Sequence, residues 1–158
     1  MDVRSSFVKK AGTLITKKNN IKNKKIITAI SSTKNDTKIT LVGVRDKPGI
    51  AASIFEPLSK NFINVDMVVQ NISANGIDTD VTFTIRSEDH IKAFKYIKNN
   101  KNINFKKIII DNKVSKVSII GVGMVTTPGV TFRMFKCLSK KNINICLLYT
   151  SDAADDDA

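Results

Sequence analysis

The pattern of apolar and polar residues first predicts a strand that leads into a helix. Residues 38–44 alternate between the two types and are rich in β-branched side chains, which predicts a strand. A turn is predicted at residues 46–49. Apolar residues then recur at helical spacing from Ile50 to Leu58, and Asn61 ends the predicted helix.

The pattern continues with more strands and a second helix. Strands are predicted at 65–72 and 80–85, joined by a turn at residues 75–76. Ser87 caps a second helix, and a last strand follows at 105–110. The order β-α-β-β-α-β predicts an α/β fold of the α+β, ferredoxin-like type, with an antiparallel sheet covered on one face by two helices.

The opening of this pattern occurs twice. Residues 38–44 and the following Pro48-Gly49 return as residues 116–122 and Pro128-Gly129. A repeat of roughly 75 to 80 residues is too long for a solenoid unit and suits a small domain. We therefore predict two copies of one module.

The second copy is predicted to be incomplete. Its expected elements are a strand at 116–122, a turn at 127–129, a helix at 130–141 and the start of a strand at Asn144. The residues after Cys146 end in a run of Asp and Ala that cannot supply the missing elements. This tail resembles the translation of a common sequencing adapter, so we expect a truncated reading frame; a genuine acidic tail is the alternative.

Composition and charge change the picture little. The chain has 158 residues, is 42% apolar and carries a formal net charge of +12. The apolar content is ordinary for a globular protein. The lysine excess accompanies many Ile and Asn residues, as an AT-rich genome produces, and no aromatic residues alternate with the lysines. We therefore expect the lysines to lie on solvent-exposed faces of the protein, and we expect no nucleic-acid partner.

Few residues indicate redox, metal or acid–base chemistry. Cys137 and Cys146 lie nine residues apart with no CxxC and no nearby His, so neither a disulfide framework nor a metal site is expected. Cys137 is expected to be a small buried hydrophobe. His90 is expected to be an exposed first-turn residue of a helix rather than a base. With no signal peptide and no span of about 20 apolar residues, we expect a cytoplasmic protein without a membrane partner.

The turn at residues 46–49 has the chemistry to bind a zwitterion. Pro48 stiffens it, Gly49 lets the backbone approach a guest, and the first N–H groups of the helix attract a carboxylate. Asp46 at its rim suits an α-ammonium group. The turn alone leaves a second interpretation open, in which Asp46 only caps the helix and Gly49 only permits the turn.

The next two strands carry polar side chains in apolar surroundings. Asp66, Gln70 and Asn71 interrupt the strand at 65–72, and buried polar groups need partners. A neighbouring chain or a bound zwitterion would provide them. Asp80 and Thr82 add hydrogen-bonding groups, for which structural pairing is the alternative.

Taken together, these stretches resemble the C-terminal regulatory part of aspartokinase, which is built from two ACT domains. The resemblance covers residues 2–145, and residues 3–15 are similar to the end of the family's kinase domain. A generic ACT domain would share the Pro-Gly turn but not Gln70-Asn71-Ile72-Ser73. The stretches that carry the resemblance are 26–30, 38–40, 46–51, 64–73, 80–84 and 117–124.

The resemblance implies a domain plan and a function. Residues 1–25 would be a remnant of the kinase domain and a linker, 26–113 a first ACT domain, 114–146 an incomplete second one, and 147–158 a tail foreign to the family. Two chains would pair through their ACT domains and bind lysine, threonine or both at the interface, for feedback inhibition of aspartate phosphorylation. A stand-alone ACT module for ligand binding or dimerisation is the alternative.

The family's effector-binding residues carry over to matching positions in both copies. In the second copy, Thr126-Thr127 replaces the Ser-His of many relatives, which leaves the ligand choice there open. The expected effector residues are Asp46, Gly49, Ile50, Ala51, Asn64, Asp66, Gln70, Asn71, Ser73, Thr82, Pro128, Gly129, Val130, Asn142, Asn144 and Ile145.

The family's catalytic domain is not matched by any stretch of this chain. We therefore expect the chain alone to be inactive as a kinase, with ATP and magnesium needed only by the missing domain and no cofactor here. It would be either a fragment of a longer aspartokinase or a separate small regulatory subunit that pairs with a catalytic chain. The kinase-like residues 3–15 favour the fragment.

Overall fold

The computed structural model describes residues 2–3, 7, 11–14, 26–72, 76–121, 123–124 and 127–149. Their contacts divide the chain into two compact units. The first unit is Ser31–Ser118, and the second combines the described residues before Ser31 with those after Ser118.

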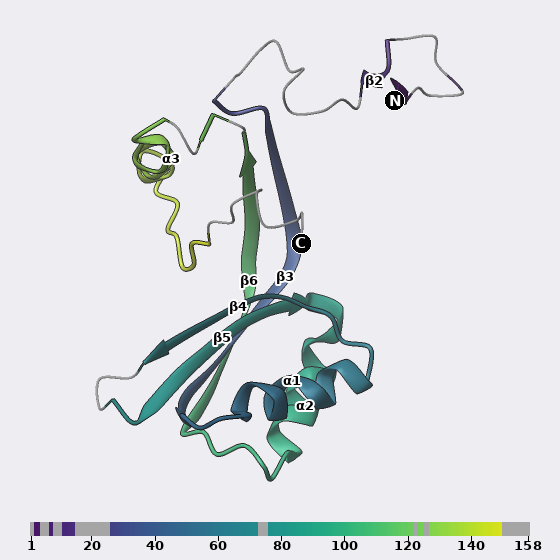
Figure 1. The fold of residues 1–158 in the computed structure, drawn as a ribbon, viewed down its shortest axis with the longest axis vertical. Coiled ribbons are helices and arrows are strands. Elements are labelled where there is room, and N and C mark those ends of the chain that lie inside the picture. The colour runs from purple at the N-terminus through teal and green to yellow at the C-terminus, as the bar shows by residue number, and fades with distance from the viewer. Residues whose placement is uncertain are drawn as a thin grey trace. The chain divides into compact units, whose positions relative to one another are not determined.

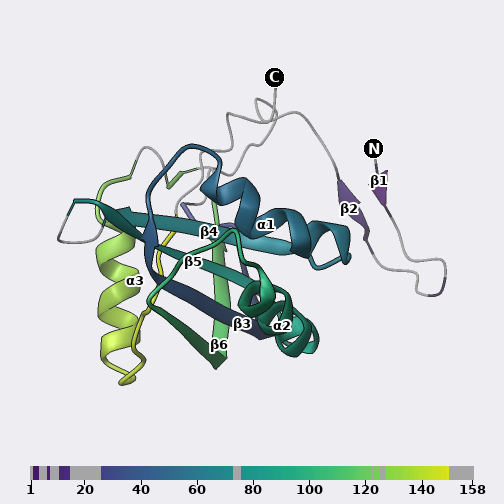
Figure 2. The ribbon, with the colours of Figure 1, turned by 90° about the horizontal axis from the view of Figure 1, so that it is seen from below.

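The first unit is a four-stranded sheet with two helices on one face (Figures 1 and 2). The strands lie in the order β4-β5-β3-β6, and β5 pairs antiparallel with both β3 and β4. This confirms the predicted ferredoxin-like βαββαβ fold. The elements are β3 (Ala29–Arg45), α1 (Ile50–Lys60), β4 (Val65–Ile72), β5 (Asp78–Arg86), a 3-10 turn η2 (Ser87–Asp89), α2 (His90–Asn99) and β6 (Lys107–Ile120).

The core lies between this sheet and the helices. Alternate residues of the central strands are fully buried, including Ile39 and Phe83, and they meet Ile54 of α1 and Ile97 of α2. Phe55 adds an edge-to-face contact with Phe83, with ring centroids 5.3 Å apart. Burying an apolar side chain of this size stabilises the fold by about 1.5–3 kcal/mol. The apolar residues of α1 recur at helical spacing because that spacing turns them all toward the core.

β3 and β6 are longer than the sequence pattern predicts. The strand predicted at 38–44 is part of β3, which already begins at Ala29, and the strands predicted at 105–110 and 116–122 merge into β6. Backbone hydrogen bonds mark the two ends of this ladder: Lys106 N–H to Val42 O and Thr28 N–H to Ile120 O, each 2.8 Å. The first seven residues of β3 are exposed. Because neither face of this part is buried, its sequence does not alternate between apolar and polar residues, and the pattern could not predict it.

The second unit contains fewer described elements. They are a short antiparallel pair, β1 (Asp2–Val3) with β2 (Thr13–Leu14), and α3 (Val130–Ser139). The strand predicted to start at Asn144 is not formed, since residues 143–149 have no regular structure. Cys137 is exposed and not buried as predicted, because Val130 is the one buried residue of α3.

Two local predictions also need correction. Ser87 starts the 3-10 turn η2 and is not the N-cap of α2, which is Asp89. His90 is half-buried rather than exposed, and its Nδ1 lies 2.6 Å from the Ser87 carbonyl oxygen.

α1 and α3 begin and end in the same way, which is how the sequence repeat appears in the structure. Each starts after a left-handed glycine, Gly49 with φ 85° and Gly129 with φ 82°. Each is followed within three residues by a left-handed residue, Phe62 with φ 58° and Asn142 with φ 53°. The next N–H bonds back to a leucine carbonyl at 3.0 Å, as in a Schellman motif.

Candidate functional site

The N-terminus of α1 is open toward solvent. The first intrahelical bond runs from Ser53 N–H to Gly49 O at 3.0 Å, which leaves the N–H groups of Ala51 and Ala52 without a partner inside the helix. Gly49 and Ala51 are exposed, and no atom lies within 4 Å of the Cβ position of Gly49. These N–H groups and the helix dipole favour an anion at this position.

Asp46 lies beside this helix end without capping it. Its backbone N–H donates to Ile77 O at 3.2 Å, whereas its exposed carboxylate makes no hydrogen bond with the described residues. The interpretation in which Asp46 only caps the helix therefore does not hold in this structure. Ile50 is 4% exposed, so it can reach a ligand through its backbone but not through its side chain.

A bulge in β3 sets the position of this turn. Its register with β5 shifts between Leu41 and Val44, and Gly43 adopts a φ of 67°. The Gly43 N–H donates to Asp80 Oδ1 at 2.8 Å. Beside it, Lys106 Nζ lies 2.7 Å from Asp78 Oδ2, and a Cβ on Gly43 would lie 2.6 Å from the Lys106 stem. Sequence reasoning gave Gly43 no role, although a glycine inside a β-branched strand is a bulge signal.

β4 is an edge strand, and its polar residues point to different faces. Gln70 pairs with Val81 on the side of the helices, whereas Asn71 pairs with Asp80 on the opposite side. Both are exposed and lie at the end of the sheet where β3 runs into the turn at Asp46. The structure therefore brings Gln70 and Asn71 to the same end as α1's N-terminus.

Thr82 is a buried residue of the sheet rather than an open ligand contact. It is 8% exposed, and its Oγ1 lies 3.0 Å from Thr40 Oγ1 on β3. Structural pairing, the alternative for this residue, is what the structure shows. Ser73 lies outside the described residues.

Asn64 and Asp66 lie at the other end of β4. Both are exposed, and Asp66 forms an ion pair with Lys116 of β6. Five residues separate Asp66 from Asn71, which is roughly 15 Å along a strand. Within one chain, Asn64 and Asp66 therefore lie far from the turn at Asp46.

The second copy repeats the helix start in its own unit. Arg133 N–H donates to Gly129 O at 3.0 Å, in the same geometry as in the first copy. Pro128 and Gly129 are exposed, and Val130 is 6% exposed. Among the other predicted residues of this copy, Asn142 and Asn144 are exposed and Ile145 is half-buried.

The described residues contain neither a candidate metal-ion cluster nor a helix of membrane-spanning character. No group of three or more His, Cys, Asp or Glu residues there could hold a metal ion. None of the helices in the described part of the chain has the length and apolarity to span a membrane.

The ferredoxin-like module, with the open N-terminus of α1 and the exposed edge strand β4, places the chain in a class of small α+β domains. A family model described as "ACT domain" matches residues 39–100 and 117–154. The match extends beyond residue 146, where we expected the family likeness to end.

Comparison with curated and solved proteins gives the particular family. The chain is 40% identical over 152 residues to the aspartate kinase of Pseudomonas fluorescens and 37% identical over 154 residues to the aspartokinase of Corynebacterium glutamicum. It covers 37% of the length of each. The regulatory subunit of aspartate kinase from Thermus thermophilus, in its ligand-free form, matches with a TM-score of 0.72 at 30% identity, covering 80% of this chain and 83% of that one. The chain belongs to the ACT domain family, as a regulatory region of aspartokinase.

Proposed function

We propose that this region senses lysine, threonine or both and transmits feedback inhibition to an aspartate kinase. The observation that carries the proposal is the pairing of an open helix N-terminus at Gly49 with the exposed Asp46 carboxylate. A carboxylate receptor next to an ammonium receptor is the minimum needed to recognise an amino acid. The coupling between effector and kinase would be about 1–3 kcal/mol, as is typical of allosteric proteins.

Two chains would complete the site by pairing along β4. Its outer edge has no strand beside it among the described elements, and Val68 and Ile72 are exposed hydrophobic residues on it. An antiparallel pairing of two β4 edges reverses the strand direction, so the Asp66 end of a second copy would lie near the Asn71 end of the first. This explains why residues expected in one site lie roughly 15 Å apart within one chain.

The attached kinase would be either the same polypeptide or a separate chain. This chain covers 37% of the length of its curated relatives, which favours a single polypeptide that also contains a catalytic domain. The Thermus thermophilus regulatory subunit favours a small chain that pairs with a catalytic one. In both cases we propose a cytoplasmic location, with ATP and magnesium serving only the kinase domain.

Substitution of Asp46 tests this proposal. We expect Asp46→Asn to weaken binding of the effector about tenfold or more, because a hydrogen bond to a charged group contributes about 1.5–3 kcal/mol. Glu88→Gln is the matched control, since it removes one exposed negative charge far from the turn in sequence and structure. Unchanged affinity in a calorimetric titration of Asp46→Asn would remove Asp46 from the site.

A further inference from the structure

We infer that Lys116 occupies the position of a ligand's side-chain ammonium group on Asp66 and competes with the effector for that carboxylate, while Asp46 receives the α-ammonium group. The inference rests on the proposed function, in which Asp66 is one of the effector-binding residues. It assigns to Lys116 a role in setting the affinity and the ligand choice of the site.

The ion pair joins two strands at opposite edges of the sheet. Asp66 is the second residue of β4, and Lys116 lies 50 residues later on β6. The sheet order places β5 and β3 between these strands. The two side chains can meet because the β3–β6 ladder continues beyond Asp36 and Arg86, the last pair between β3 and β5. The pair is therefore built by the fold rather than by sequence neighbours.

The exposure of the pair makes it exchangeable. The Lys116 side chain is 38% exposed and that of Asp66 is 54% exposed. A pair this open to solvent contributes little to stability, so Lys116 does not hold Asp66 as a buried partner would. Lys116 is thus a cation on Asp66 that a second cation can replace.

The positive charge of Lys116 opposes binding of a ligand ammonium group to Asp66. A second ammonium group at the same carboxylate is repelled by the first, because like charges a few ångström apart interact unfavourably even near water. The ligand ammonium must therefore displace Lys116. Lys116 lies two residues before Ser118, the last residue of the first unit.

Removal of the Lys116 charge tests the competition. In calorimetric titrations, we expect Lys116→Met to tighten binding of L-lysine by about two- to fivefold, which corresponds to the strength of an exposed ion pair. Binding of L-threonine, which has no side-chain ammonium group, should stay unchanged. Lys113→Met is the matched control, because it removes a charge from an exposed lysine of the same strand, and it should leave the affinity unchanged. In an Asp66→Asn background, Lys116→Met should have no effect.

The outcomes separate this inference from the proposed function. Unchanged or weaker binding by a folded Lys116→Met variant overturns the competition while the sensor function stands. Absence of binding by the unaltered chain overturns the proposed function and the inference together. If Lys116→Met does not fold, Lys116→Arg replaces it: Arg holds a carboxylate with two parallel bonds, so we expect at least twofold weaker binding, and unchanged or tighter binding overturns the inference.

Discussion

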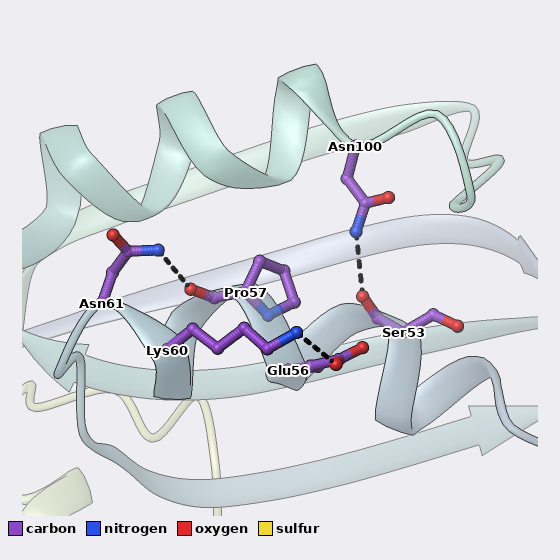
Figure 3. A network of polar contacts seen from close by, with 6 residues as sticks. All are labelled: Ser53, Glu56, Pro57, Lys60, Asn61 and Asn100. Carbon is purple, nitrogen blue, oxygen red and sulfur yellow. Dashed lines mark hydrogen bonds and ion pairs between the residues drawn. The ribbon is translucent and has the colours of Figure 1, made fainter.

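Asn100 compensates for a proline inside α1, and its removal should destabilise the fold. Pro57 has no N–H, so the Ser53 carbonyl lacks its usual helical partner. The Asn100 side chain supplies one instead, with Nδ2 donating to Ser53 O at 2.9 Å (Figure 3). The same figure shows Asn61 Nδ2 donating to Pro57 O at 2.8 Å. Asn100 thus fixes the half of α1 that carries the candidate effector site.

The expected cost of Asn100→Ala follows from the bonds that it breaks. The substitution removes the bond to Ser53 and also the 3.0 Å bond that Asn100 Oδ1 accepts from Asn102 N–H. A hydrogen bond contributes about 0.5–1.5 kcal/mol net, and a partly buried carbonyl without a partner costs about 1–3 kcal/mol. We therefore expect a loss of about 2 kcal/mol in the free energy of unfolding, measured by urea denaturation followed by circular dichroism.

A double-mutant cycle tests the proposed cause. In a Pro57→Ala background, the backbone N–H that the alanine restores can serve the Ser53 carbonyl, so Asn100→Ala should cost only about 1 kcal/mol, with a coupling of about 1 kcal/mol. Asn99→Ala is the control, because Asn99 is exposed on the last turn of α2, and such surface changes stay within about 0.5 kcal/mol. An equal cost of Asn100→Ala with and without Pro57 would refute the reasoning.

Two further predictions concern the end of α1 and the edge strand. Phe62 holds a left-handed φ of 58° and is 94% exposed, so Phe62→Asn should stabilise the fold by about 0.5–1 kcal/mol in urea denaturation, because Asn tolerates this conformation at little cost and no packing is lost. Phe62→Leu should give no gain, and a destabilised Phe62→Asn variant would contradict the Schellman geometry. Gln70→Ala should weaken effector binding in calorimetry while leaving the urea midpoint unchanged, because Gln70 is exposed on the edge strand; a lowered midpoint would mean that its role is structural.

The first module was largely predictable because its elements bury one face. β4 spans Val65–Ile72 and α1 begins at Ile50, as the apolar periodicity predicts. The extra length of β3 and β6 was not predictable, since it depends on backbone pairing between residues that remain exposed in β3 and exposed or half-buried in β6. Burial of Cys137 was expected from its place among apolar residues, but Cys137 is exposed in α3. The strand at Asn144 was expected because the second copy begins like the first, but residues 143–149 have no regular structure.

The candidate site was predictable in its residue types but not in its geometry. The Pro-Gly turn and Asp46 indicate a zwitterion site because their chemistry is local. The sequence could not show that Thr82 pairs with Thr40 or that Asp66 pairs with Lys116, because both contacts join residues more than 40 positions apart. Nor could it show that Gln70 and Asn71 lie at the end of the sheet where β3 runs into the turn at Asp46, which depends on the registers of β5 with β3 and β4.

The most direct test of the sensor function is a calorimetric titration of the whole chain with L-lysine and with L-threonine, with light scattering on the same samples. The account predicts saturable binding of at least one of the two amino acids, together with a dimer that the ligand stabilises. A folded chain that binds neither amino acid, at any oligomeric state, would contradict it.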